Sequence, residues 1–143
     1  MRRSLCLLSL CLALPLQAQE KVVNLYSWAD YVAPQTLQRF ERETGYKVRY
    51  DTFDTTEVLE TKLLTGGSGY DVVVPSSTVL ARALKAKALQ PLDAQAMPGY
   101  ANLDKDLLAK LAEADPGNRY AVPYTWGTLG LGVNVEAVRQ RLG

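Results

Sequence analysis

Apolar and polar positions along this chain follow two alternating periods, which predict strands and helices in turn. Residues 21–27 hold closely spaced valine, leucine and tyrosine and predict a buried strand. Residues 34–44 carry apolar side chains three positions apart among charged ones, which is typical of an amphipathic helix opened by a proline. Residues 46–53 return to strict alternation and predict a second strand.

The same order is predicted to repeat further along the chain. A helix is expected with Asp54 as its N-cap and its end before the glycine pair 66–67. Its buried face is expected to comprise Val58, Leu59 and Leu63. Residues 71–75 read Asp-Val-Val-Val-Pro, an apolar run that predicts a strand covered on both faces. The helix after this strand is expected to be capped by Ser76, Ser77 or Thr78.

This alternation predicts an α/β fold with a parallel sheet. Right-handed crossovers make the three strands parallel, so their carboxyl ends meet at one edge of the sheet. Residues 28–31, Asp54 and residues 76–78 follow these three ends. We therefore expect them to face one crevice, where open α/β sheets bind ligands.

The cluster after the first strand is the main candidate for a binding site. Trp28, Asp30 and Tyr31 combine two aromatic faces with one carboxylate. A carboxylate binds an ammonium group through charge-assisted hydrogen bonds, and ring faces attract cations, so the cluster suits an organic cation. The alternative interpretation is structural: the two aromatics belong to a core and Asp30 starts a helix.

The last part of the chain no longer follows the regular alternation of strands and helices. Residues 104–114 predict an amphipathic helix and residues 115–118 a turn. Residues 120–134 are expected to form two extended runs, within which Trp126 is either a pocket wall or a core residue. Residues 135–142 predict a helix capped by Asn134.

The amino-terminal residues predict export. A basic pair, an apolar stretch over residues 5–16 and a small residue at Ala18 are typical of a secretory signal peptide cleaved after position 18. Both cysteines, Cys6 and Cys11, lie within it, and the chain has no histidine. A mature chain without Cys and His excludes Cys-His and Ser-His-Asp catalysis, and thiolate or imidazole metal sites.

Charge argues against a nucleic-acid partner. Removing Arg2 and Arg3 leaves 14 Lys and Arg against 15 Asp and Glu, so the formal net charge changes from +1 to −1. The basic residues are dispersed, with Lys85 and Lys87 the densest pair, which is typical of a solvated helix face.

Four segments together carry a family resemblance. They read Tyr-Ser-Trp-Ala-Asp-Tyr at 26–31, Phe-Glu-Arg-Glu-Thr-Gly-Tyr-Lys-Val at 40–48, Tyr-Asp-Val-Val-Val-Pro-Ser at 70–76 and Ala-Val-Pro-Tyr-Thr-Trp-Gly-Thr at 121–128. From about residue 24 to residue 143 the chain resembles the periplasmic putrescine- and spermidine-binding proteins of ABC importers. The resemblance implies a class II (type II) periplasmic-binding fold of two lobes that close by hinge bending. Residues 1–18 would be the signal peptide, residues 19–128 an incomplete first lobe, and residues 129–143 the hinge crossing and the truncated start of the second.

The resemblance also implies roles for individual residues. Trp28 matches a pocket aromatic, Asp30 the acidic residue near an amine, Tyr31 a second aromatic contact and Ser76 a polar contact. Ala29 departs from the pattern, because the family usually has Ser or Thr at this position. Thr78 stands where spermidine-type relatives can carry a large aromatic residue, which favours putrescine. No enzymatic activity, cofactor or metal is implied.

The expected function is capture of putrescine, or of spermidine or cadaverine, in the periplasm for the permease of an ABC transporter in the inner membrane. The full-length receptor is expected to be a monomer. Two alternatives stay open: a secreted hydrolase that uses the carboxylates of Asp30 and Asp54, and a truncated remnant without function. For the chain as printed, we expect apolar surface to stay uncovered on the layer of Val22, Val48 and Val73 and along residues 129–133.

Overall fold

The structure is a computed structural model that describes residues 21–127 and 130–143. The predicted signal peptide, residues 1–18, lies outside the described residues, as does Leu129 of the predicted hinge crossing. The strands are β1 (Val22–Trp28), β2 (Lys47–Phe53) and β3 (Val72–Val73). The α-helices are α1 (Pro34–Thr44), α2 (Thr56–Leu64), α3 (Ser77–Lys85), α4 (Lys105–Leu111) and α5 (Val135–Leu142). Two 3₁₀ turns, η1 (Ala94–Ala96) and η2 (Tyr100–Asn102), precede α4.

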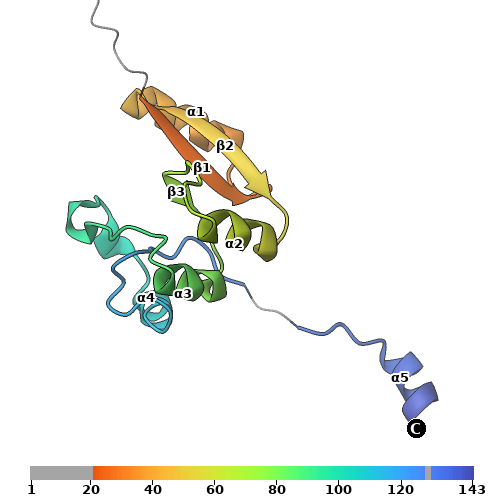
Figure 1. Ribbon diagram of the computed structural model, residues 1–143. Coiled ribbons are helices and arrows are strands. Elements are labelled where there is room, and N and C mark those ends of the chain that lie inside the picture. The colour runs from red at the N-terminus through yellow and green to blue at the C-terminus, as the bar shows by residue number, and fades with distance from the viewer. Residues whose placement is uncertain (1–20, 128–129) are drawn as a thin grey trace, which may run out of the picture.

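The three strands form one parallel sheet in the order β2-β1-β3, as the alternation predicts (Figure 1). β1 pairs with β2 along its whole length, from Val22 opposite Lys47 to Trp28 opposite Phe53. Both strands therefore end at the same edge of the sheet. The α/β class and the common carboxyl edge are confirmed.

β3 differs from the prediction of a strand covered on both faces. It pairs with β1 only at two positions, and the side chain of Val72 is 48% exposed. The prediction was wrong because β3 lies at the edge of the sheet and nothing in the described ranges covers this side chain. Asp71, just before β3, still ties it to β1, because its carboxylate accepts hydrogen bonds from the backbone and side-chain nitrogens of Asn24 at 2.8 and 3.1 Å.

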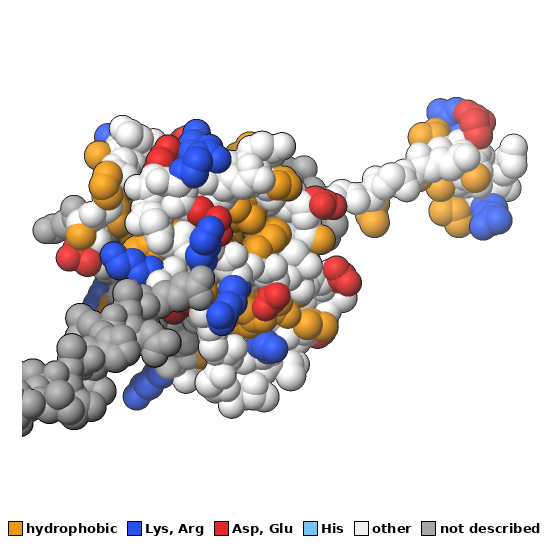
Figure 2. Space-filling model, turned by 90° about the horizontal axis from the view of Figure 1, so that it is seen from above, with side chains coloured by type: hydrophobic (Ala, Val, Ile, Leu, Met, Phe, Trp, Pro, Cys, Tyr) orange, Lys and Arg blue, Asp and Glu red, His pale blue; other side chains and the backbone are white. Residues whose placement is uncertain are grey.

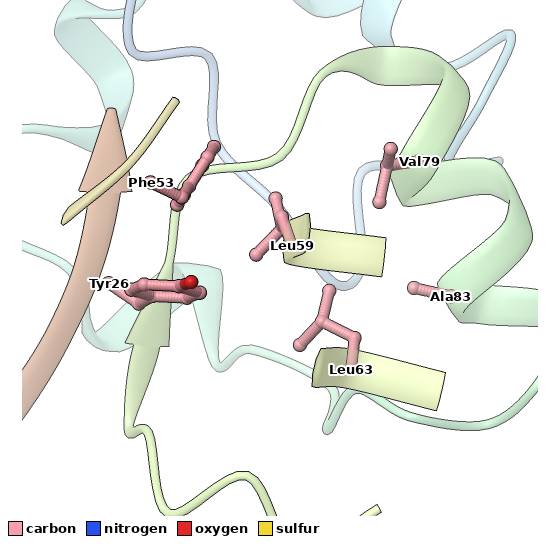
Figure 3. Packing of buried hydrophobic residues seen from close by; sticks show 6 residues of the cluster. All are labelled: Tyr26, Phe53, Leu59, Leu63, Val79 and Ala83. Atoms are coloured by element: carbon pink, nitrogen blue, oxygen red, sulfur yellow. The ribbon is translucent and has the colours of Figure 1, made fainter. Parts of the chain in front are cut away.

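The core lies between the sheet and the helices α2 and α3. Its buried side chains are Tyr26, Phe53, Leu59, Leu63, Val79 and Ala83 (Figure 3). The rings of Tyr26 and Phe53 meet edge to face with centroids 4.8 Å apart, a favoured aromatic geometry. An ion pair between Arg82 of α3 and Glu60 of α2 joins the two helices and lowers the pKa of the Glu60 carboxyl, chiefly through the hydrogen bond from Arg82.

Two predictions about α2 were wrong. Its N-cap is Thr55, whose hydroxyl accepts a hydrogen bond from the backbone N–H of Val58, and Asp54 lies one residue earlier. Val58 is 51% exposed, whereas Leu59 and Leu63 are buried. The physical reason is the helical period: Leu59 and Leu63 share a face four residues apart, while Val58 points about 100° away from Leu59.

Tyr70 closes one end of the core. Its ring stacks on that of Tyr26 with centroids 4.4 Å apart, and its hydroxyl donates to the carboxylate of Asp51 at 2.9 Å. Burial, followed by this hydrogen bond and the negative charge of Asp51, raises the pKa of Tyr70 to about 12. The phenol is thus held in its neutral form.

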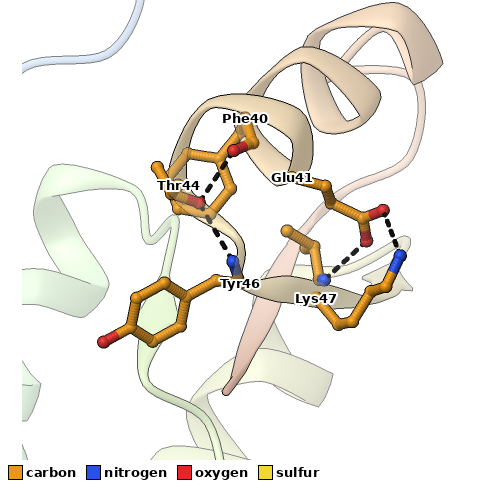
Figure 4. Close-up of polar contacts among 6 residues, drawn as sticks. Phe40, Glu41, Thr44, Tyr46 and Lys47 are labelled. Carbon is orange, nitrogen blue, oxygen red and sulfur yellow. Dashed lines mark hydrogen bonds and ion pairs between the residues drawn. The ribbon is translucent and has the colours of Figure 1, made fainter. Parts of the chain in front are cut away.

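α1 is fixed against the start of β2 by side chains of its last turns (Figure 4). The Glu41 carboxylate accepts from the backbone N–H of Val48 at 2.9 Å and pairs with Lys47 at 3.2 Å, and these contacts, the Val48 bond first, lower the pKa of Glu41. The Thr44 hydroxyl donates to the Phe40 carbonyl and accepts from the Tyr46 N–H. Gly45 ends the helix at φ 73°, as the glycine predicted.

The carboxyl-terminal part of the described chain packs loosely. α4 is shorter than the predicted helix over residues 104–114: Asp104 is its N-cap, it ends at Leu111, and residues 112–114 form turns. Residues 120–127 and 130–134 form no strand, because no neighbouring strand in the described ranges pairs with them. α5 has the predicted Asn134 cap and stands apart from the sheet (Figure 1). Figure 2 shows hydrophobic side chains exposed on α5 and on the chain leading to it.

The prediction of uncovered apolar surface is confirmed at Leu131 and Val133 but not on the layer of Val22, Val48 and Val73. Leu131 is 95% exposed, while Val22, Val48 and Val73 are half-buried. None of the helices in the described part of the chain has the length and apolar character of a membrane span.

Candidate ligand-binding site

The candidate site begins where β1 and β2 end together. Their paired register places Trp28 beside Phe53, with ring centroids 4.6 Å apart. Trp28 is half-buried, and its carbonyl accepts a hydrogen bond from the Tyr50 hydroxyl at 3.0 Å. The indole is therefore packed against Phe53 at the sheet edge and is only partly covered.

Ala29 and Asp30 form an exposed turn directly after β1. Asp30 adopts φ 60°, in the left-handed region, which is unfavourable for most side chains and tolerated best by Asn and Asp. The Tyr31 N–H returns to the Trp28 carbonyl at 3.4 Å and closes the turn. Within the described ranges no ion pair involves Asp30, so its carboxylate faces solvent at the end of the sheet.

Tyr31 joins this edge to a segment far along the chain. Its ring lies 6.2 Å from that of Trp28 on one side and 6.2 Å from that of Tyr124 on the other. The Tyr124 hydroxyl donates to the Tyr31 carbonyl at 2.5 Å, across 93 positions of sequence. The result is a row of aromatic rings that runs from Phe53 through Trp28 and Tyr31 to Tyr124.

A hollow opens at the outer end of this row. It has a volume of about 560 Å³. Its lining residues are Tyr31, Tyr124, Thr125, Trp126 and Gly127. Trp126 is 71% exposed, so among the described residues it is a wall of the hollow and not part of the core.

Of the site residues predicted from the sequence, only Tyr31 lines this hollow; the others do not, namely Trp28, Ala29, Asp30, Ser76 and Thr78. Ser76 and Thr78 lie at the same sheet edge, after β3. Ser76 occupies the N-cap position of α3, where its side chain makes no capping hydrogen bond, and Thr78 is exposed in the first turn. The structure thus brings together Trp28, Asp30 and Tyr31, and leaves Ser76 and Thr78 outside the row of rings.

Sequence reasoning missed Tyr124 as a partner of Tyr31. The available signal was the pair of aromatic residues, Tyr124 and Trp126, directly after Pro123. Sequence alone could not show which ring this segment meets. Within the described ranges, no group of three or more acidic, histidine or cysteine side chains lies close enough to hold a metal ion.

Comparison with known proteins identifies the family. The family of bacterial extracellular solute-binding proteins matches residues 21–140. The chain belongs to this family. Its members are binding proteins and not enzymes, so the alternative of a carboxylate hydrolase has no support.

Individual relatives agree with the resemblance drawn from the motifs, which is confirmed. The chain is 52% identical to the putrescine-binding periplasmic protein SpuD of Pseudomonas aeruginosa over 126 residues, which are 88% of this chain and 34% of that protein. It is 50% identical to the putrescine-binding periplasmic protein PotF of Escherichia coli over 128 residues, 90% of this chain and 35% of that protein. This family member therefore spans about a third of the length of these relatives.

Solved structures show the same similarity. The spermidine/putrescine ABC transporter substrate-binding protein PotD of Streptococcus pneumoniae matches with a TM-score of 0.69 and 35% identity, over 73% of this chain and 32% of that one. The PotD lipoprotein of Treponema pallidum matches with the same TM-score at 31% identity, over 73% of this chain and 33% of its own. The parallel three-stranded sheet is thus part of a solute-binding protein fold.

Proposed function

We propose that this chain forms part of a periplasmic receptor for putrescine or a related polyamine, spermidine or cadaverine. The observation that carries the proposal is the row of rings from Trp28 to Tyr124, with Asp30 in the exposed turn between Trp28 and Tyr31. Relatives that share about half of the sequence are named for putrescine binding, which supports the same ligand class.

The chemistry of the row matches a diamine. Each ammonium end of a diamine needs a carboxylate or the face of a ring, and Asp30, Trp28 and Tyr31 offer both. The methylene chain needs apolar area, which ring faces supply. The hollow of about 560 Å³ lies within the range of roughly 300–1,000 Å³ that is usual for small-molecule sites.

The proposed architecture follows the family resemblance in its finer detail. Residues 1–18 are a signal peptide for export, residues 19–128 belong to the first lobe of a class II fold, and residues 129–143 cross to the second lobe. The separation of α5 from the sheet and the exposure of its apolar side chains support this division. Closure of a second lobe over this edge of the sheet would remove water from Asp30 and strengthen its attraction for an ammonium.

The same reasoning leads to the remaining partners. A receptor of this type delivers its ligand to the permease of an ABC transporter in the inner membrane. The PotD relative is named as the substrate-binding protein of a spermidine/putrescine ABC transporter. Ser76 and Thr78, at the start of α3, are proposed as polar contacts of a bound ligand. Monomeric behaviour of the full-length receptor stays a prediction.

Isothermal titration of the gene product, expressed in full, tests the proposal. Putrescine, cadaverine and spermidine are titrated in parallel with 1,4-butanediol, which has the four-carbon chain of putrescine without its charges. We expect saturable binding of at least one amine and none of the diol. The absence of measurable binding of all three amines would refute the proposal. Equal binding of the diol would show that the charges of the amine do not contribute to recognition.

A further inference from the structure

The described residues hold one buried charged side chain, that of Asp115. It is 1% exposed and follows α4 at the start of the 115–118 turn. One of its oxygens, Oδ2, accepts hydrogen bonds from the backbone N–H groups of Tyr120 at 2.8 Å and Ala121 at 3.0 Å. These two residues begin the segment that carries Tyr124 and Trp126 into the hollow.

The cost of burying this group argues for a specific role. A charged side chain away from water is unfavourable unless hydrogen bonds compensate it. The second oxygen of Asp115, Oδ1, has no hydrogen-bond partner within the described part of the chain. Both compensating bonds therefore come from the two N–H groups at the base of the aromatic segment.

Asp115 itself is firmly held. Its backbone N–H bonds to the Leu111 carbonyl at 2.9 Å, which continues the last turn of α4. Asn118 of the same turn adopts φ 49°, and its side-chain amide donates to the Leu108 carbonyl at 3.1 Å. The carboxylate is thus a fixed point just after α4, against which residues 120 and 121 are placed.

The path from this fixed point to the hollow is short and stiff. Tyr124 lies three positions after Ala121, a reach of at most about 11 Å. Pro123 within this stretch has a locked φ angle. No strand pairing holds residues 120–127. The Asp115 carboxylate ties the base of the segment, next to a backbone bond from the Leu92 N–H to the Arg119 carbonyl at 2.7 Å. The bond from the Tyr124 hydroxyl to the Tyr31 carbonyl ties it further along.

We propose that Asp115 is a positioning residue for the polyamine site. Its carboxylate fixes the base of residues 120–127 and so presents Tyr124 and Trp126 to the ligand without touching it. The inference rests on the proposed function for its consequence in binding, while the placement of the segment is independent of any ligand.

The first experiment is hydrogen exchange of the gene product, expressed in full and without ligand, as wild type and as Asp115→Asn. We expect faster exchange in peptides that cover residues 120–127, including positions beyond Ala121. Asp104→Asn is the matched control, because Asp104 also accepts two backbone N–H bonds, from Asp106 and Leu107, but at the start of α4. Faster exchange confined to Tyr120 and Ala121 would overturn the inference.

The second experiment is a double-mutant cycle on putrescine affinity. Asp115→Asn is expected to weaken binding about tenfold, and combination with Tyr124→Phe to add little, because both changes release the same segment. Asp104→Asn is expected to leave the affinity within twofold. Fully additive losses, or a lower melting temperature with unchanged affinity, would reduce Asp115 to a structural role and overturn the inference.

A second variant covers the case in which Asp115→Asn does not fold. Pro123→Gly leaves the buried carboxylate in place but loosens its connection to Tyr124. It is expected to weaken putrescine binding in the same non-additive way, and an unchanged affinity would overturn the inference. If the wild type binds no polyamine, the proposed function fails, while the exchange experiment still decides whether Asp115 positions the segment.

Discussion

Two regions of the molecule differ sharply in how their apolar side chains are covered. The sheet body, residues 22–85, buries Leu59 and Val79 completely and pairs β1 with β2 over seven positions. The carboxyl-terminal segment, residues 120–127 and 130–143, forms no strand and leaves Leu131 95% and Leu142 82% exposed. The sheet body has its own core, whereas the segment depends on tethers at single points.

The candidate site lies where these two regions meet. The sheet body supplies Trp28, Asp30 and Tyr31 from the end of a well-paired strand, and the segment supplies Tyr124 and Trp126 from a stretch without ladder hydrogen bonds. The site thus has one half on the end of a paired strand and one half on a segment without strand pairing. The predictions that follow test the sheet body and the carboxyl-terminal segment separately.

The largest expected effect is in the core of the sheet body. Leu59→Ala should lower the free energy of unfolding by about 2–5 kcal/mol, because it removes a fully buried side chain between the sheet and α3. Val58→Ala is the matched control, since Val58 is 51% exposed, and should change it by no more than about 0.5 kcal/mol. Urea denaturation measures both. Similar costs for the two variants would show that α2 does not face the core as described.

Asp30→Asn tests the part of the site that the sheet body supplies. The variant should weaken putrescine binding roughly tenfold to a hundredfold, since a hydrogen bond to a charged group contributes about 1.5–3 kcal/mol. Asp54→Asn removes another exposed carboxylate, at the end of β2, and should leave the affinity unchanged. Titration calorimetry that finds equal losses in both variants would point to general charge attraction and not to a contact at Asp30.

Ionisation of Tyr70 should lower the stability of the folded protein at high pH. Its pKa of about 12 in the folded protein lies above the ordinary value of 10.0, so the folded state holds this proton more tightly than the unfolded state. The resulting stabilisation is complete below about pH 10 and is lost as the pH rises from 10 to 12. Denaturation midpoints of wild type should therefore fall more steeply over this window than those of Tyr70→Phe. Parallel curves would contradict the burial of the phenol.

Tyr124→Phe tests the tether between the two regions. It removes the hydrogen bond to the Tyr31 carbonyl but keeps the ring, so putrescine affinity should fall by about 1 kcal/mol, roughly fivefold. Tyr120→Phe is the control, because no hydrogen bond of that hydroxyl is present within residues 21–127 and 130–143. Equal affinities for Tyr124→Phe and wild type would mean that the ligand does not depend on this tether.

The smallest effect is expected in the exposed segment. Leu131→Ser should change the free energy of unfolding by no more than about 0.5 kcal/mol, since the side chain is almost fully exposed. A loss above 1 kcal/mol in urea denaturation of the expressed gene product would reveal that another part of the protein covers Leu131.

Local periodicity predicted most of the sheet body. α1 has the predicted bounds, and the order of strands and helices made a parallel sheet the simplest arrangement. The N-cap of α2 was misplaced because Asp54 and Thr55 are adjacent and both suit a cap. Val72 was misjudged because its burial depends on neighbours that no local pattern reveals. Whether residues 120–127 and 130–134 pair with a strand depends on such neighbours too.

The site shows the same limit. The position of Trp28, Asp30 and Tyr31 at a strand end followed from periodicity, but the meeting of Tyr31 with Tyr124 is a tertiary contact across 93 residues. The left-handed conformation of Asp30 likewise depends on the turn that the Tyr31 N–H closes onto the Trp28 carbonyl. The presence of an aspartate alone does not predict this conformation.

Hydrogen exchange with and without putrescine tests the central claim most directly, namely that the two regions form one polyamine site. In the wild-type gene product, expressed in full, putrescine should slow exchange at residues 29–31 and at residues 120–127 together, while residues 34–53 of α1 and β2 stay unchanged. Binding that slows exchange elsewhere and leaves both of these segments unaffected would contradict the account.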